Sequence, residues 1–250
     1  MDLQTFFVEN PAGALAFSGG TDSSLLVWAA ARYGKNWTAY YVRSVFQPAF
    51  ERKDAEKIAG QCGLPMRVLE ADVLACPDIV RNPENRCYEC KKKIFGLILS
   101  QAAADGYSLI IDGTNASDDA GDRPGMKAVR ELRVRSPLRE CGITKEQVRE
   151  MSRQAGLFTW DKPSYACLAT RIPAGTAITP EALQAVENGE NALFDLGFSN
   201  FRIRVRGGGA VVQLPAGQME NAFARRTEIA GRLAPYFPLV SLDLNPRPAE

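Results

Sequence analysis

The sequence contains no histidine, so a Ser–His pair, a Cys–His pair and histidine metal ligands are all excluded. It has no apolar stretch of the roughly 20 residues that cross a bilayer, and its first residues, MDLQTFFVEN, lack a basic region before an apolar run. It also lacks a charge excess, because 30 basic residues balance 29 acidic ones. No global field therefore gathers polyanions. We expect a cytoplasmic protein with no membrane partner, and the charge gives no support for nucleic-acid binding.

The chain is long enough for one large domain and a small one, with 250 residues of which 46% are hydrophobic. In a reducing compartment its cysteines are expected to be free thiols or metal ligands. Three of them have no partner at ligand spacing and are interpreted as packing residues: Cys62, Cys76 and Cys141.

Short apolar runs alternate with helical segments over the first two thirds of the chain. Strands are predicted at 14–17, 39–42, 66–69 and 109–111, and helices at 23–33, 50–62, 87–104 and 145–154. This alternation predicts an α/β fold, a parallel sheet with helices on both faces. Thr144 and Gln147 match a capping box, which indicates a helix start at about residue 145.

The pattern changes after a segment rich in Pro and Gly at 172–177. A helix is expected at 180–196, strands at 201–205 and 211–214, then another helix and a strand at 239–244. We therefore predict two domains, 1–170 and 171–250, of which the second is a small α+β domain for substrate binding or oligomerisation.

One polar, glycine-containing loop lies between the first predicted strand and the following helix: Ser18, Gly19, Gly20, Thr21, Asp22, Ser23 and Ser24. Free backbone N–H groups and the helix dipole favour a bound anion there, and glycines let the backbone approach it closely. The loop has no lysine, so it is not built to clamp a γ-phosphate. The alternative is a glycine-rich turn before a well-capped helix.

Polar residues also follow the strand predicted at 109–111: Asp112, Gly113, Thr114 and Asn115. This is the strand end where α/β sheets bind ligands, so the turn is a candidate for holding a nucleotide or magnesium, with an ordinary turn as the alternative. Asp118 and Asp119 face either metal or solvent. Arg123 is an orientable cation suited to a substrate phosphate or carboxylate.

Three cysteines are candidates for chemistry. Cys87 and Cys90 place two thiols within one turn, a spacing that suits a metal or cluster, with a partial zinc knuckle or two buried thiols as alternatives. Cys167 stands near Arg171, a cation that favours the thiolate, with an inert buried thiol as the alternative.

Arginines alternate along the strand predicted at 201–205. Arg202, Arg204 and Arg206 would project from one face and could bind a phosphate and a carboxylate. The alternative is a solvated sheet face.

Taken together, these stretches resemble the LarE-like ATP-dependent sulfur transferases of the PP-loop ATP pyrophosphatase superfamily. The match covers the loop at 18–24 and the stretches 82–91, 112–115, 123–128, 135–138 and 162–171. The resemblance implies ATP-dependent adenylation of a carboxylate on a pyridinium mononucleotide, release of pyrophosphate and sulfur transfer to the acyl carbon, in the making of the nickel-pincer nucleotide cofactor. It implies magnesium at Asp22 and substrate contacts from Arg202 and Arg204, in addition to the candidate Arg123. Glu190 matches a family acidic position and is a further candidate for substrate contact, with a surface helix carboxylate as the alternative.

The resemblance implies two sources of sulfur. In one branch of the family the cysteine matching Cys167 gives up its own sulfur and becomes dehydroalanine. In the other, cysteines like Cys87 and Cys90, together with the one matching Cys167, hold a 4Fe-4S cluster whose open iron binds a sulfide. Because this chain has all three cysteines, we predict the cluster branch.

One departure from the family stands at 207–209, where three glycines replace histidines that members often carry. The partners implied are a small-molecule nucleotide, a sulfur donor or nickel-insertion protein, and further copies of the chain in a homo-oligomer. The competing hypotheses are a tRNA-thiolating PP-loop enzyme and a non-catalytic nucleotide-binding zinc protein.

Overall fold

The computed structural model describes residues 1–118 and 124–248, which form two compact units. The first unit contains residues 1–73 and 85–162, and the second contains residues 74–84 and the chain from Pro163 onward. Asp119 and Arg123, both considered for the site, lie outside the described residues. The domain boundary near residue 170 stays a prediction.

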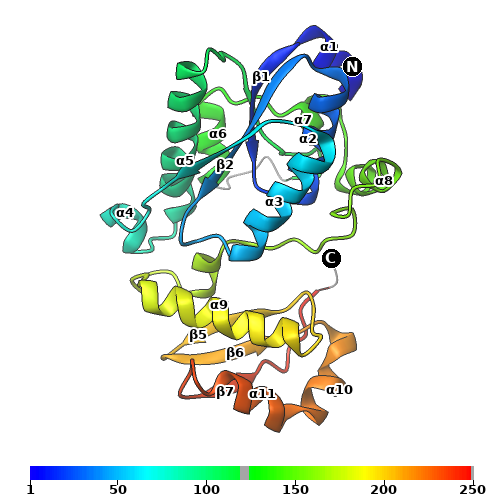
Figure 1. Cartoon of the computed structure of the whole chain (residues 1–250). Helices are drawn as coiled ribbons and strands as arrows, with labels where there is room; N and C mark the ends of the chain where they lie inside the picture. The colour runs from blue at the N-terminus through cyan, green and yellow to red at the C-terminus, as the bar shows by residue number, and fades with distance from the viewer. Residues whose placement is uncertain (119–123, 249–250) are drawn as a thin grey trace. The chain divides into compact units, whose positions relative to one another are not determined.

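The first unit is built on a parallel sheet, which confirms the predicted α/β class. Its strands are β1 (Ala12–Phe17), β2 (Asn36–Arg43), β3 (Met66–Glu70) and β4 (Ile110–Ile111), in the order β3-β2-β1-β4 (Figure 1). Phe17 pairs with Tyr41, and Leu15 pairs with Ile111. The loops that follow β1 and β4 therefore leave the same edge of the sheet side by side.

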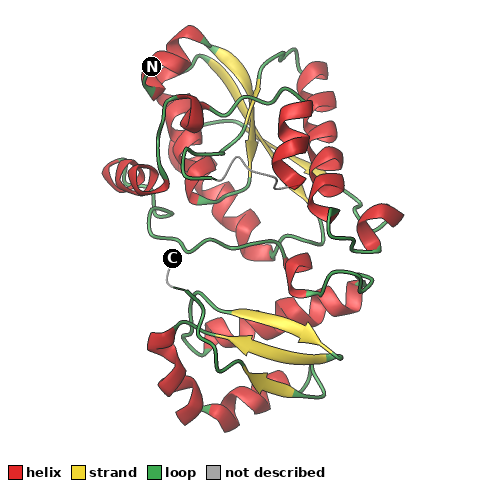
Figure 2. Ribbon diagram, turned by 180° about the vertical axis from the view of Figure 1, so that it is seen from behind, coloured by secondary structure: helices red, strands yellow, loops and turns green. Residues whose placement is uncertain are grey.

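Helices cover both faces of this sheet (Figures 1 and 2). On one face lie α1 (Leu3–Glu9), α2 (Thr21–Tyr33), α3 (Ala49–Cys62), α7 (Pro137–Glu140) and α8 (Lys145–Gln154), and on the other α5 (Arg86–Ala104) and α6 (Pro124–Glu131). Fully buried side chains fill the first of these interfaces, among them Phe6, Phe7, Leu15, Leu25 and Ile58. Burial of this apolar surface is the main force that fixes the sheet.

Local capping signals set the starts of two helices. Thr144 and Gln147 form the predicted capping box, with the Gln147 N–H donating to Thr144 Oγ1 at 3.3 Å and the Thr144 N–H donating to Gln147 Oε1 at 2.9 Å. Helix α1 was not predicted. Its signal is Asp2, whose carboxylate accepts the Thr5 N–H at 2.7 Å.

The second unit combines a small sheet with helices. Its elements are α4 (Pro77–Val80), the 3₁₀ helix η1 (Leu168–Arg171), α9 (Pro180–Asp195), β5 (Arg202–Arg206), β6 (Gly209–Gln213), α10 (Ala216–Ala224), α11 (Arg226–Leu233) and β7 (Val240–Leu242). β6 pairs antiparallel with β5 and parallel with β7. The one helix expected after β6 is two short ones. Among the described residues, no helix is both long enough and apolar enough to cross a bilayer.

The glycines at 207–209 lie at the β5–β6 turn. Arg206 pairs with Gly209, and the two residues between them, Gly207 and Gly208, have φ angles of +54° and +77°. A two-residue hairpin loop with both φ angles positive favours glycine. The requirements of the hairpin turn therefore explain why glycines stand at positions 207 and 208.

Candidate active site

The loop after β1 is shaped by close backbone packing. Gly19 has a φ of +76°, and a Cβ placed on it would lie 2.8 Å from the carbonyl oxygen of Glu51 in α3. Only glycine fits this conformation and this contact. Gly20 is the N-cap of α2 and provides no side-chain cap, so the first turn of the helix remains open to an external acceptor such as phosphate.

The hydroxyls of this loop divide into two groups. Ser18 is exposed, and its Oγ lies 3.2 Å from Ser23 Oγ. Thr21 is buried and donates to the carbonyl oxygen of Thr159 at 2.8 Å. Ser24 is fully buried, and its Oγ has no hydrogen-bond partner among the described residues. The structure thus places Thr21, Ser23 and Ser24 in the interior and leaves Ser18 exposed, while the role of these residues in holding phosphate stays a prediction.

Asp22 connects three segments that are distant in the sequence. Asn115 Nδ2 donates to Asp22 Oδ1 at 3.0 Å, and Lys145 Nζ lies 2.5 Å from Asp22 Oδ2. The side chains of Asp22 and Lys145 are 23% and 30% exposed, so the pair remains accessible to solvent and to a ligand. A carboxylate in this position is chemically suited to Mg²⁺, which prefers oxygen ligands.

The turn after β4 packs directly on the loop after β1. A Cβ on Gly113 would lie 3.0 Å from the backbone nitrogen of Ser23, so the two loops touch through their main chains. Thr114 instead bonds within its own turn, donating its hydroxyl to Asp112 Oδ2 at 2.7 Å, and Asp112 Oδ1 accepts the Ser136 hydroxyl at 2.7 Å. The turn is therefore held in place by its own hydrogen bonds and borders the loop after β1.

Lys145 is the residue that sequence reasoning missed. The loop itself has no lysine, but the start of α8 brings this one to Asp22. The capping box was a usable signal, because it made Lys145 the first residue of a helix. What the pattern did not indicate is that α8 packs on α2, which places that first residue beside the loop.

Cys87 and Cys90 lie in the first turn of α5. Cys87 is exposed and Cys90 is half-buried, and the Arg86 guanidinium donates to Cys87 Sγ at 3.7 Å. Among residues 1–118 and 124–248, no group of three or more potential metal ligands is found. The pair therefore provides two sulfur ligands and not a complete site.

Cys167 lies in the second unit, immediately before η1. Its carbonyl oxygen accepts two hydrogen bonds from Thr170, one from the N–H at 2.9 Å and one from the hydroxyl at 2.8 Å. Cys167 thus stands on an ordered backbone turn and is half-buried as a residue.

Glu190 and Arg171 form a buried ion pair in the same unit. Their side chains are 1% and 0% exposed, and Arg171 Nε lies 2.7 Å from Glu190 Oε1. Burial alone would lower the pKa of Arg171, but the hydrogen bond and charge of Glu190 outweigh it and raise that pKa above its ordinary value. Arg171 therefore stays charged, and Glu190 balances its charge.

Arg202 and Arg204 are both directed at the segment that carries Cys167. Arg202 Nη2 donates to the carbonyl oxygen of Ser164 at 2.6 Å, and Arg204 donates to the carbonyl oxygen of Thr170 and to Gln213 Oε1. Arg206, at the end of the same strand, is exposed. The predicted common face therefore holds two arginines engaged with protein oxygens and one in solvent.

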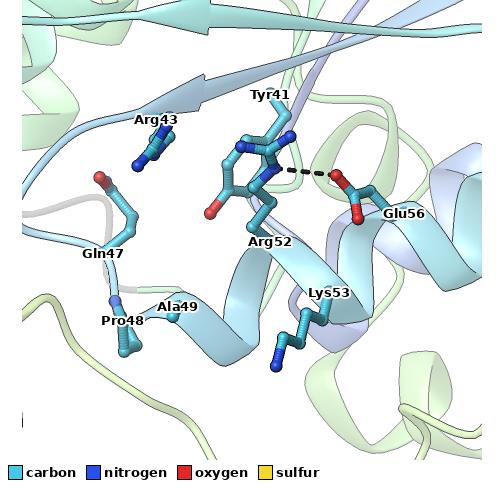
Figure 3. Close-up of a pocket in the computed structure, with 8 residues that line it drawn as sticks. All are labelled: Tyr41, Arg43, Gln47, Pro48, Ala49, Arg52, Lys53 and Glu56. Carbon is cyan, nitrogen blue, oxygen red and sulfur yellow. Dashed lines mark hydrogen bonds and ion pairs between the residues drawn. The ribbon is translucent and has the colours of Figure 1, made fainter.

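A separate pocket of about 340 Å³ opens in the first unit between β2 and the start of α3 (Figure 3). Tyr41, Arg43 and Arg52 face it. Arg43 pairs with Glu70 at 3.3 Å, and Arg52 pairs with Glu56 at 2.8 Å. Lys53 is a third cation of the lining, and we assign no chemistry to this pocket.

Known proteins resemble the chain over most of its length. An uncharacterised protein of Synechocystis sp. is 38% identical over 221 residues, which cover 88% of this chain and 82% of that protein. The pyridinium-3,5-bisthiocarboxylic acid mononucleotide synthase of Lactiplantibacillus plantarum is 30% identical over 233 residues, 92% of this chain and 84% of that protein. The argininosuccinate synthase of Haloarcula marismortui is 30% identical over 159 residues, 59% of this chain and 38% of that protein. No protein-family model matches the chain.

Proposed function

The chain belongs to the LarE-like family of PP-loop proteins, and from this premise we propose that it is an ATP-dependent sulfurtransferase acting on a pyridinium dicarboxylate mononucleotide. The product would be the corresponding thiocarboxylate, in line with the name of the Lactiplantibacillus relative. We further propose that the enzyme works in the cytoplasm. The observation that carries this proposal is the loop after β1, where close packing at Gly19 fixes the backbone and the start of α2 has no side-chain cap, which suits it to a phosphate.

The first half-reaction would be adenylation. A substrate carboxylate oxygen attacks the α-phosphorus of ATP, the bond to the bridging oxygen of the β-phosphate breaks, and pyrophosphate leaves. The uncapped turn of α2 would hold the departing phosphates, and Asp22 would hold magnesium on them. Lys145 adds a positive charge beside Asp22, which offsets repulsion between that carboxylate and the phosphates.

The second half-reaction would deliver sulfur. A sulfur nucleophile attacks the acyl carbon, the bond to AMP breaks, and AMP leaves. Cys167 is the candidate nucleophile because it is a half-buried cysteine on an ordered turn. If Cys167 donates its own sulfur, loss of its Cα proton forms the Cα–Cβ double bond, the Cβ–S bond breaks, and dehydroalanine remains.

The cluster-bound sulfide is the other proposed source, and it rests on the spacing of Cys87 and Cys90. Their thiolates suit two corners of an iron–sulfur cluster, and Cys167 would supply the third ligand. The described residues form no such set of three. The ligand set is thus incomplete as described, and we derive no step through a cluster.

The test is an anaerobic preparation of the whole chain given ATP and the biscarboxylated pyridinium mononucleotide. Pyrophosphate, thiocarboxylate, iron, acid-labile sulfide and the mass of the Cys167 peptide are measured together. Pyrophosphate release with thiocarboxylate formation supports the proposal. Iron and sulfide with an intact Cys167 identify the cluster source, and dehydroalanine without iron identifies the sacrificial one.

Two variants assign the half-reactions. Asp22→Asn is expected to suppress pyrophosphate release, because it removes the charge that would hold magnesium. Cys167→Ser is expected to keep pyrophosphate release and lose the thiocarboxylate. Pyrophosphate release that requires tRNA instead of the mononucleotide would contradict the proposed substrate.

A further inference from the structure

We propose that Glu190, Arg171, Arg202 and Arg204 are positioning residues that hold the Cys167 segment in one conformation, and that Glu190 acts through Arg171 and Tyr165 and not as a ligand of the substrate. This inference rests on the proposed function only in naming Cys167 as the reacting group. The contacts themselves all lie within the second unit.

The three arginines share a target, the backbone carbonyls around Cys167. Arg202 donates to Ser164 O at 2.6 Å, Arg171 Nη1 to Ala166 O at 2.9 Å, and Arg204 to Thr170 O. These carbonyls lie on both sides of Cys167 in the chain. Charge-assisted hydrogen bonds of this kind are stronger than neutral ones, so the arginines fix the backbone that carries the thiol.

Glu190 has no capacity left for a substrate. Its Oε1 accepts Arg171 Nε at 2.7 Å and the Ile203 N–H at 2.9 Å. Its Oε2 accepts Arg171 Nη2 at 3.1 Å and the Tyr165 hydroxyl. A carboxylate offers about four acceptor positions, and protein donors fill all four. With 1% exposure, Glu190 serves to orient Arg171 and Tyr165.

Tyr165 links the arginines to one another. The Arg171 and Arg202 guanidinium carbons lie 4.6 Å and 5.4 Å from the centre of its ring. Both distances are within the range of a cation–π interaction. The ring belongs to the same segment as Cys167, so this contact also restrains the segment.

The energetics of the Glu190–Arg171 pair favour a role in fixing the conformation of the Cys167 segment. A buried ion pair contributes little stability compared with well-packed apolar side chains, and buried polar networks are in some proteins kept because they specify one conformation. Here Glu190 and Arg171 specify the turn that presents Cys167. A reacting thiol gains from such restraint, because small displacements of reacting atoms reduce rates strongly.

The experiment compares three variants of the full chain. Tyr165→Phe removes one hydrogen bond to Glu190 and keeps the aromatic ring, Glu190→Gln removes the central charge, and Arg206→Gln changes the exposed arginine of the same strand as a matched control. Tyr165→Phe is the mild variant that remains informative if Glu190→Gln does not fold.

The first readout needs no substrate. Amide hydrogen exchange at Thr170, whose N–H bonds to Cys167 O, is expected to accelerate about tenfold or more in Tyr165→Phe and Glu190→Gln, because a hydrogen bond to a charged group is lost. The rate at which iodoacetamide alkylates Cys167 should also differ from that of the unaltered chain in these two variants. Arg206→Gln should leave both rates unchanged. Unchanged exchange in both altered variants would overturn the inference.

The second readout separates positioning from substrate binding. Tyr165→Phe is expected to lower kcat about tenfold with KM for the mononucleotide within about threefold, since only the orientation of the thiol is affected. A raised KM with unchanged kcat would identify substrate ligands and overturn the inference. If the unaltered chain does not turn over the mononucleotide, the proposed function fails, whereas the exchange measurement still decides the positioning role.

Discussion

The loop after β1 and the Cys167 segment are both ordered, but by different forces. The loop is held by main-chain proximity, with Gly19 against α3 and Gly113 against Ser23, and its charged side chains remain partly exposed. The Cys167 segment is held by buried charges, with Glu190 and Arg171 almost fully removed from solvent. Steric fit orders the first region and electrostatic satisfaction orders the second.

This difference indicates what each region tolerates. A backbone-packed loop fails when a side chain is added, because there is no space and no alternative conformation. A buried charge network fails when one partner is removed, because the remaining charge is left without compensation.

Removing Glu190 is expected to have the largest effect on stability. Glu190→Ala leaves Arg171 buried without a counter-charge and should lower the free energy of unfolding by about 3–5 kcal/mol. Urea unfolding of the full chain measures this. Glu228→Ala is the matched control, because its pair with Arg225 is exposed, and it should change little. Equal effects of the two substitutions would contradict the electrostatic explanation.

Adding one methyl group to the loop is the corresponding test of steric fit. Gly19→Ala combines a left-handed backbone with a contact 2.8 Å from Glu51 O and should cost about 2 kcal/mol or more. Gly60→Ala is the control, since it lies in α3 with no atom within 4 Å of the added Cβ, and it should be neutral or stabilising. If Gly19→Ala unfolds at the same urea concentration as the unaltered chain, steric fit does not order the loop.

Lys145 tests whether charge also matters at the loop. Lys145→Ala leaves Asp22 uncompensated and should raise KM for MgATP about tenfold, the effect of losing one charged contact. Lys145→Arg should restore most of the affinity. Arg153→Ala, an exposed position on the same helix, is the control. Pyrophosphate-release kinetics give the result, and an unchanged KM in Lys145→Ala would remove this residue from the site.

The thiols give the smallest and most local test. Burial raises the pKa of Cys62 and of Cys141, so at neutral pH both carry a smaller fraction of the reactive thiolate. Cys87 is exposed. In peptide mass spectrometry of the folded chain treated with iodoacetamide, Cys87 should be alkylated before Cys62 and Cys141. Faster labelling of either buried thiol would show that burial does not control their reactivity.

Most regular elements could be predicted from local patterns. The parallel strands and their helices follow from alternating apolar runs, and the start of α8 follows from Thr144 and Gln147. Helix α1 was missed because its short apolar run is marked only by the Asp2 cap. The helix after β6 was predicted as one element and is two, α10 and α11.

The site was only partly predictable. The positions of Gly19 and Asp22 follow from a strand–loop–helix pattern, and the structure confirms that this pattern is present. The pairing of Lys145 with Asp22 spans 123 residues, a separation at which local propensity carries no signal. For the arginines of β5, the spacing predicted that they share one face of the strand. It did not predict which backbone carbonyls they contact.

The sequence by itself determined the α/β class, the glycine-containing loop after β1 and the identity of the groups able to do chemistry, because these depend on local periodicity, backbone freedom and side-chain type. Tertiary structure alone decided which charges are paired. It placed Lys145 on Asp22 and enclosed Glu190 with Arg171. The physical reason is that hydrogen bonds and ion pairs act over a few ångströms, and only the packed chain brings such distant residues that close.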